Sequence, residues 1–172
     1  MARIVPVPQR NPAMLIEAPL DNLGPAVDPD AVDRRIDWLD LTWAQTLQRA
    51  VRQTTRGGEK VRILTRLGVR LRHGDVLRRA TDDAPAVAIN IRPCQLLIAR
   101  PVSSSELASL CYELGNLHVP VQIDNSRVMT ISDGPVEAVL VKLGIPYETG
   151  VARFEPTLTA PTFALSPGLG VE

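Results

Sequence analysis

Residue types that bind metals or act as nucleophiles are scarce in this chain of 172 residues, which holds two histidines, His73 and His118, and two cysteines, Cys94 and Cys111. Cys111 falls on an apolar helical stripe, and free cysteine is among the most buried residue types, so a core role is expected for it. Cys94 opens a predicted strand and has no evident base or metal partner. A hydrolase built from Cys111, His118 and Asp124 would need a buried helix face and an outward strand face to converge. We reject it, and no enzymatic activity is expected.

The two histidines differ in their local sequence. His73 lies in a His-Gly-Asp turn, where an exposed polar residue needs no functional explanation. His118 directly follows residues 115–117 at a helix-to-strand connection, and strand alternation places it opposite Val119 and Val121, so we expect it to face outward. One imidazole is a poor site for a borderline divalent ion, which needs several donors. A two-fold axis would bring two copies of His118 together, an arrangement that the sequence permits but does not show.

The elements around His118 follow a clear order. Leu96 to Ala99 form an apolar run typical of a central strand. Ser103 and Glu106 have the spacing of a capping box, which predicts the start of a helix. An apolar stripe continues that helix, and Gly115 is expected to supply its left-handed final residue. The stripe consists of Leu107, Leu110, Cys111 and Leu114.

Beyond His118 the pattern returns to strands. Two short apolar segments flank an Asp-Asn-Ser turn at 124–126, and a second helical stripe runs from Val136 to Leu143 before Gly144. Residues 145–154 leave room for a last strand. The fold class is therefore α+β, with a β-rich N-terminal domain followed by a ferredoxin-like βαββαβ domain over residues 93–157.

Residues 1–92 are predicted to form the β-rich domain. Six prolines in the first 30 residues predict an extended or partly disordered arm there. Strand alternation through Leu39, Leu41 and Trp43, followed by a Gly-Gly hairpin signal at 57–58, indicates a small all-β module. Residues 158–172 lack periodicity and are expected to form a flexible tail.

Composition limits the function classes. The chain is 45% apolar with no net formal charge, and its apolar runs are too short to cross a bilayer, so we expect a soluble protein. Residues 1–92 carry 15 basic and 11 acidic side chains, whereas residues 93–172 carry 4 and 8. This uneven charge could bias the halves toward different partners. Neither a nucleic acid nor a membrane is expected among them, and the absence of an export signal leaves the cytoplasm as the expected compartment.

Three segments resemble a known family. Residues 112–123 read Tyr-Glu-Leu-Gly-Asn-Leu-His-Val-Pro-Val-Gln-Ile, which is similar to the signature of UreE urease accessory proteins, where Leu-Gly-Asn-Arg-His runs into a strand. Residues 71–77 resemble the Leu-Arg-x-Gly-Asp-x-Leu turn of that family's N-terminal domain, and Phe-Glu-Pro at 154–156 is a third match. Together the matches span roughly residues 36–156.

The resemblance implies a homodimeric, cytoplasmic metallochaperone. Its β-rich domain would contact partner proteins, and its ferredoxin-like domain would dimerise. His118 would bind a nickel ion with its symmetry mate, and the metal would pass to the urease apoprotein within an assembly of accessory proteins that includes a GTPase.

Two departures from the family leave alternatives open. Leu117 replaces the signature arginine, and residues 157–172 contain no histidine, although many family members have one in their tail. The remaining ligands are therefore undefined. One alternative is a UreE-like dimeric interaction module with weak or lost metal binding. Another is a regulatory ferredoxin-like domain that binds a small molecule.

Overall fold

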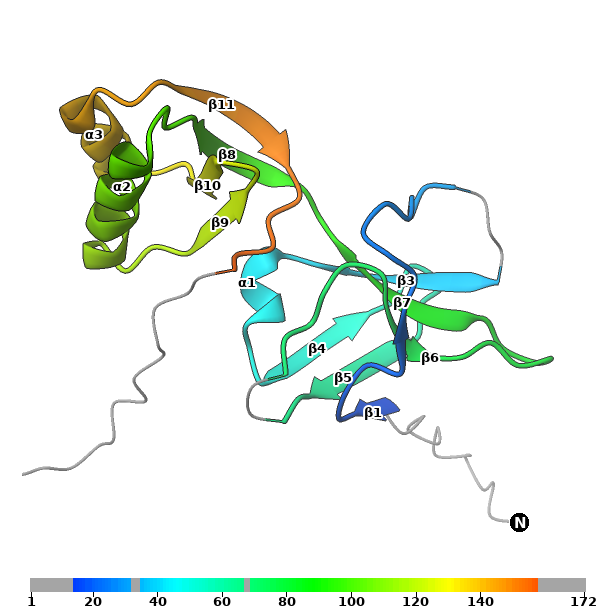
Figure 1. Ribbon diagram of the computed structural model, residues 1–172. Coiled ribbons are helices and arrows are strands. Elements are labelled where there is room, and N and C mark those ends of the chain that lie inside the picture. Colours follow the sequence, from blue (N-terminus) through cyan, green and yellow to red (C-terminus); the bar gives the residue numbers. More distant parts are fainter. Residues whose placement is uncertain (1–13, 32–34, 67–68, 158–172) are drawn as a thin grey trace, which may run out of the picture. The chain divides into compact units, whose positions relative to one another are not determined.

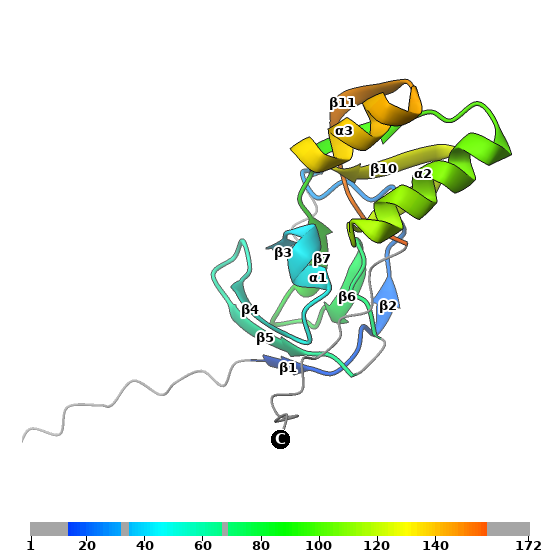
Figure 2. The same cartoon turned by 90° about the vertical axis from the view of Figure 1, so that its left-hand side faces the viewer.

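The computed structural model describes residues 14–31, 35–66 and 69–157, without the side chains of residues 14–16. The described chain divides into two compact units, with the boundary between Arg92 and Pro93. Figure 1 labels the elements of both units except β2, which Figure 2 labels. In chain order they are β1 (Met14–Ile16), β2 (Asp21–Asn22), β3 (Ile36–Leu41), α1 (Trp43–Thr46), β4 (Ala50–Thr54), β5 (Lys60–Leu64), β6 (Asp75–Arg78), β7 (Ala86–Ile91), β8 (Cys94–Ala99), α2 (Ser104–Asn116), β9 (Val121–Asp124), β10 (Arg127–Ile131), α3 (Gly134–Leu143) and β11 (Tyr147–Ala152).

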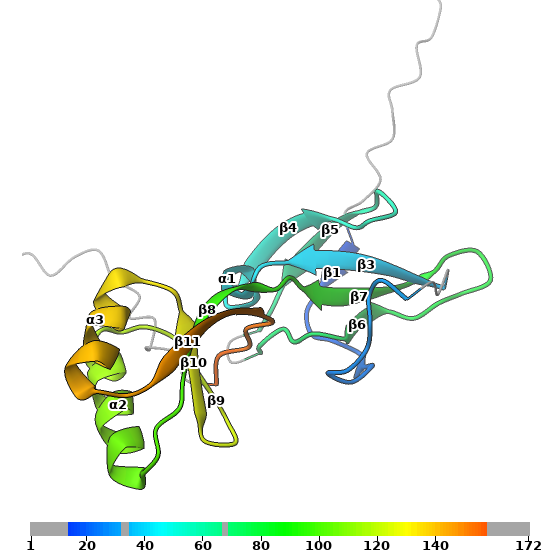
Figure 3. The same ribbon diagram turned by 90° about the horizontal axis from the view of Figure 1, so that it is seen from above.

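The N-terminal unit is built from two small sheets, ordered β1-β5-β4 and β2-β6-β7-β3 (Figures 2 and 3). Strand β3 pairs with β7 in parallel, whereas β6 pairs with β7 in antiparallel orientation. Inward residues of both sheets form one apolar core, which explains the alternation seen in the sequence. The buried members of this core are Leu39, Leu41, Val51, Val61, Ile63, Leu71, Leu77, Val87, Ile89 and Ile91. The predicted β-rich character of this half is confirmed.

Strands β4 and β5 form the hairpin that the Gly-Gly signal predicts. Thr54 pairs with Lys60, and the Thr55 N–H donates to the Glu59 carbonyl across the turn at 2.8 Å. Gly58 adopts a positive φ of 93°, which residues with a Cβ rarely adopt.

One expectation for the strands of the first half is wrong. Trp43 does not extend the preceding strand, because it opens the short helix α1. The Thr42 hydroxyl accepts from the Gln45 N–H while the Gln45 side chain accepts from the Thr42 N–H, and this reciprocal cap favours a helical turn over an extended chain.

The proline-rich arm contributes two short strands from residue 14 onward, which agrees with an extended chain there. Strand β1 pairs in parallel with β5, and β2 pairs with β6. Both lie at sheet edges, and Pro19 falls in the connection between them, where it interrupts no strand pairing. Residues 1–13 of the arm lie outside the described residues.

The C-terminal unit is the predicted βαββαβ arrangement. Its sheet has the order β11-β8-β10-β9 with antiparallel neighbours, so β8 is central as expected. Helices α2 and α3 cover the same face of this sheet (Figures 1 and 2). The buried core between helices and strands contains Leu97, Ala99, Leu110, Leu114, Val121, Val128, Val136, Leu140 and Ile145. This confirms the α+β fold class.

The turns of this unit also match the prediction. Asn125 and Ser126 both have positive φ at the β9–β10 turn, and Gly144 ends α3 with φ 66°. The predicted tail, residues 158–172, lies outside the described residues. No helix in the described part of the chain is long and apolar enough to span a membrane.

Candidate metal site at the end of helix α2

Helix α2, which carries the candidate site at its far end, begins at a partial capping box. The Ser103 hydroxyl accepts from the Glu106 N–H at 3.1 Å, as predicted. The Glu106 carboxylate accepts from the N–H of Val102 at 2.9 Å, one residue earlier than the usual partner. The predicted start of the helix is therefore confirmed, although the Glu106 carboxylate binds the Val102 N–H in place of the Ser103 N–H.

The end of α2 differs from the prediction. Gly115 lies within the helix, and the left-handed residue is His118, with φ 56°. The His118 N–H donates to the Gly115 carbonyl at 3.0 Å, and the Val119 N–H donates to the Leu114 carbonyl at 3.4 Å. These two bonds define a Schellman motif with His118 at the position most often taken by glycine. Val119 and Leu114 belong to the same apolar cluster, which supplies the contact that usually accompanies this motif.

Strand alternation does not set the orientation of His118, because β9 begins only at Val121. His118 is exposed because it lies just beyond a helix end, in a turn whose backbone points the side chain away from the core. Within the described residues neither ring nitrogen of His118 has a hydrogen-bond partner. Metal-binding histidines usually donate the second ring N–H to a fixed acceptor, and no such acceptor holds the His118 ring within the described residues.

No other donor in the described chain completes a site around His118. The described residues contain no group of three or more His, Cys, Asp or Glu side chains that could hold a metal ion. Glu113, on the last turns of α2, is paired with Lys142 of α3 at 3.0 Å. An imidazole nitrogen suits Ni²⁺, but one nitrogen per chain does not fill its coordination shell.

Neither cysteine belongs to a group of three or more candidate metal ligands within the described residues. Cys111 is half-buried, and not fully buried as its place on the apolar stripe predicts, because it lies at the margin of the stripe. Burial raises the pKa of the Cys111 thiol and also that of Cys94. A raised pKa makes loss of the thiol proton less favourable, and the thiolate is the form that binds metal.

His73 is the site residue whose environment the sequence prediction misjudged. It is 2% exposed, and its ring stacks on Trp38 with centroids 6.1 Å apart. The Ile91 N–H donates to Nδ1 at 3.3 Å, so Nδ1 carries no proton and the neutral ring donates from Nε2 to the Val27 carbonyl at 3.0 Å. His73 is thus a structural core residue rather than an exposed turn residue.

The turn that contains His73 forms hydrogen bonds with Asn22 of β2. The Asn22 amide donates to the His73 carbonyl at 2.9 Å and to the Asp75 carboxylate at 2.7 Å. Burial raises the pKa of Asp75, although the hydrogen bonds from Asn22 and the Arg72 N–H oppose this change. The second family-like segment, residues 71–77, therefore has a structural role in this chain.

Fold and site together define a two-domain α+β binding protein, with a β-rich unit followed by a ferredoxin-like unit that presents one exposed histidine at a helix end. Two family models match in succession. The UreE urease accessory protein N-terminal domain matches residues 20–92, and the C-terminal domain of the same family matches residues 95–164. The chain belongs to the UreE family of urease accessory proteins. Members of this family are non-catalytic, so the prediction that the chain is not an enzyme is confirmed.

Curated relatives agree with this assignment. The chain is 30% identical over 136 residues to "Urease accessory protein UreE" of Acetivibrio thermocellus, an alignment that covers 78% of this chain and 86% of the relative. The protein of the same name from Helicobacter acinonychis is 32% identical over 138 residues, or 77% of each chain. That of Flavobacterium johnsoniae is 32% identical over 108 residues, covering 62% of this chain and 64% of the relative.

Proposed function

We propose that this protein is a nickel-carrying metallochaperone that delivers Ni²⁺ for assembly of the urease active site, with His118 as its central ligand. The observation that carries the proposal is an exposed histidine in the left-handed conformation that ends α2. Such a conformation costs about 1–2 kcal/mol for a residue with a Cβ, and glycine avoids this cost. The His118 side chain is exposed, and within the described residues it makes no hydrogen bond that offsets this cost. Residues held in unfavourable conformations cluster at functional sites.

The coordination chemistry favours a shared site. Two His118 side chains, one from each copy of a homodimer, would supply two neutral imidazoles to one ion. The remaining coordination positions would be filled by water, or by oxygen donors of a partner. Such a partly filled shell suits a carrier, because a receiving protein can add its own ligands before the imidazoles leave.

Exposed apolar side chains near the helix end support the dimer in this proposal. Leu117, next to His118, is 39% exposed, and Tyr112 on α2 is 70% exposed. Large exposed apolar side chains are common at protein interfaces. Leu117 stands where the family signature has an arginine, so this chain offers an apolar contact there in place of a charge.

The proposal assigns separate tasks to the two units. Residues 93–157 would bind the metal and dimerise, and residues 1–92 would contact partner proteins. The partners are the urease apoprotein and other urease accessory proteins, including the GTPase, and the compartment is the cytoplasm. Nickel is the transported cargo in this account and not a catalytic cofactor.

A second candidate function is a UreE-like dimeric interaction module with weak or lost metal binding. It is favoured by the absence of histidine from residues 157–172, which the nickel proposal has to accommodate. In that case His118 would contribute nothing measurable to metal affinity.

Calorimetric titration of the metal-free protein with Ni²⁺ separates the two candidates. The metallochaperone should show saturable binding with one ion per two chains, and binding should disappear in His118→Ala. His73 is unsuitable as a control because it is buried. The control is Asp133→Asn, because Asp133 is exposed and its side chain makes no capping hydrogen bond to α3. Equal nickel affinity in the wild type and in His118→Ala would leave the interaction module as the better account.

A further inference from the structure

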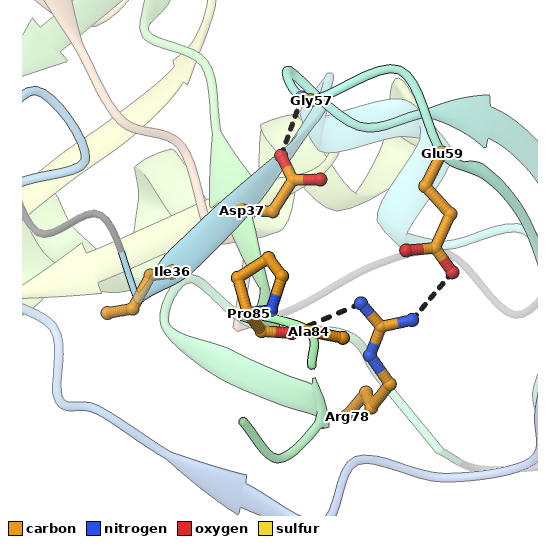
Figure 4. Close-up of a pocket in the computed structure, with 7 residues that line it drawn as sticks. All are labelled: Ile36, Asp37, Gly57, Glu59, Arg78, Ala84 and Pro85. Carbon is orange, nitrogen blue, oxygen red and sulfur yellow. Dashed lines mark hydrogen bonds and ion pairs between the residues drawn. The ribbon is translucent and has the colours of Figure 1, made fainter. Parts of the chain in front are cut away.

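The N-terminal unit contains a hollow of about 630 Å³ that is open to solvent on one side. It lies between the start of β3, the β4–β5 turn, β6 and the segment before β7 (Figure 4). Its lining residues are Ile36, Asp37, Gly57, Glu59, Arg78, Ala84 and Pro85. Hollows of this size commonly bind small molecules or single side chains.

Two carboxylates in the hollow each retain an oxygen for a ligand. Asp37 Oδ1 accepts from the Gly57 N–H at 2.7 Å, and Glu59 Oε1 accepts from Arg78 Nη1 at 2.7 Å. Within the described residues the second oxygen of each carboxylate accepts no hydrogen bond. Figure 4 shows these two oxygens pointing into the space between Asp37 and Glu59.

The position of Asp37 depends on the absence of a side chain at Gly57. A Cβ at Gly57 would lie 2.6 Å from Asp37 Oδ2, a separation that real Cβ atoms do not show. The carboxylate therefore sits directly against the turn backbone, and any larger residue at position 57 would displace it. Gly57 thus allows Asp37 to take its place at the hollow.

Arg78 is a poor anion receptor here, because both of its terminal nitrogens are engaged and the lining is acidic. Nη1 donates to Glu59, and Nη2 donates to the Pro85 carbonyl at 3.1 Å, whereas Nε is buried and has no hydrogen-bond partner within the described residues. A bulge in the β6–β7 pairing precedes Arg78, and bulges re-aim the side chains that follow them. With two carboxylates and one guanidinium, the lining carries one net negative charge.

We infer that this hollow binds a basic side chain, an arginine or a lysine, presented by a partner protein. The charged end of that side chain would lie between the free oxygens of Asp37 and Glu59 and would neutralise the lining. Its methylene stem would pack against Ile36, Ala84 and Pro85, since long basic side chains cover apolar surface along their stems. Asp37 and Glu59 are half-buried, so solvent and salt screen their attraction to a bound cation less than they would for exposed carboxylates. The inference does not require nickel at His118, so it can fail or hold independently of the proposed function.

The test is a titration of the full-length ¹⁵N-labelled protein with N-acetyl-arginine methylamide, followed by NMR at the Gly57 amide and the Arg78 Nε–H. N-acetyl-glutamine methylamide is the uncharged control probe. The arginine probe should give saturable shifts at these two signals. The glutamine probe should give no shift at the same concentrations.

Conservative variants sharpen the test. Asp37→Asn and Glu59→Gln keep the oxygen that accepts from Gly57 or Arg78, so the fold should persist. Each should weaken binding of the arginine probe by about three- to tenfold, the loss expected for one charge-assisted contact at a half-exposed site. Asp82→Asn, an exposed carboxylate in the segment before β7, is the matched control and should leave binding unchanged.

Several results would overturn the inference. Equal responses to the arginine and glutamine probes would exclude recognition of a basic group. Unchanged affinity in both conservative variants would place the binding elsewhere. Tighter binding of Mg²⁺ or of free putrescine than of the arginine probe would identify a cation or small-amine site in place of a protein-docking site.

Discussion

Replacing His118 with glycine should stabilise the C-terminal unit while removing the proposed ligand. The residue adopts φ 56° in the Schellman motif, and its exposed ring contributes no hydrogen bond within the described chain. Relief of the left-handed conformation is worth about 1–2 kcal/mol. Glycine also has more conformational freedom than histidine in the unfolded chain, which lowers the stability of the folded state by about 0.4–1 kcal/mol. The midpoints of these ranges leave a net gain of about 0.8 kcal/mol, which corresponds to a rise in Tm of about 3–6 °C for a unit of this size.

The assay is thermal and urea denaturation in buffer with a chelator, because bound metal would stabilise the wild type and mask the effect. Gly144→His provides the matched reverse change. Gly144 ends α3 with φ 66°, and a Cβ there would meet no atom within 4 Å, so only the backbone conformation is altered. Gly144→His should lower stability by a similar amount. A destabilised His118→Gly protein would refute the reasoning, because it would mean that the histidine ring makes a favourable contact in the native chain.

Three further outcomes are expected. His73→Ala should lower the free energy of unfolding by about 3 kcal/mol in urea denaturation. The substitution opens a space beside Trp38 and removes the hydrogen bonds of the ring to the Ile91 N–H and the Val27 carbonyl. A loss below about 1 kcal/mol would contradict the buried position of His73. Burial would raise the pKa of Asp40, but hydrogen bonds from Arg56 and Asn90 outweigh it and lower that pKa. A lowered carboxyl pKa gives stability that is present above the unfolded value and lost as pH falls through the folded value. Asp40→Asn should therefore lower the free energy of unfolding by about 1 kcal/mol at neutral pH and by less as the pH falls below about 4. Urea denaturation of both proteins at a series of pH values measures this difference. A difference that stays the same in acid would refute the ion pairing. Light scattering should give a dimer mass for the full-length protein without nickel, and a strict monomer at working concentration would contradict the shared site.

The order of elements could be read from the sequence because local signals marked most of their ends. In the C-terminal unit, Ser103 and Gly144 lie at helix ends as their residue types predict. The Asn125-Ser126 turn likewise matches its turn chemistry. Each of these signals acts within a few residues, so no tertiary information was needed.

The end of α2 shows where such local rules fail. Glycine has the strongest preference for the left-handed conformation, so Gly115 was the expected terminator. The Schellman motif also needs an apolar contact between the residue after the left-handed position and the third residue from the helix end. Val119 and Leu114 provide that contact. With Gly115 at the left-handed position, Asn116 would have to provide it, so the apolar pair outweighs the glycine.

The environment of His73 depended on contacts distant in sequence. Its ring partner Val27 is 46 residues away, in a proline-rich segment that has no periodic pattern. The Asn22 amide that holds the same turn is 51 residues away. Nothing in the His-Gly-Asp sequence indicates that a separate segment covers it.

The hollow beside Asp37 was equally invisible in the sequence. Its two carboxylates come from β3 and from the β4–β5 turn, and the guanidinium comes from β6. Only the pairing of these strands brings the three charges together. The Gly-Gly pair at 57–58 predicts only a turn, although Gly57 also makes room for the Asp37 carboxylate.

Native mass spectrometry after equilibration with Ni²⁺ tests the central claim most directly, because it reports the number of chains and of metal ions in one particle. The account predicts a wild-type dimer that carries one nickel ion. It also predicts a His118→Gly dimer that carries none and is no less stable than the wild type. A nickel-bound monomer, or a His118→Gly dimer that retains one nickel ion, would contradict the assignment of His118 as the shared ligand.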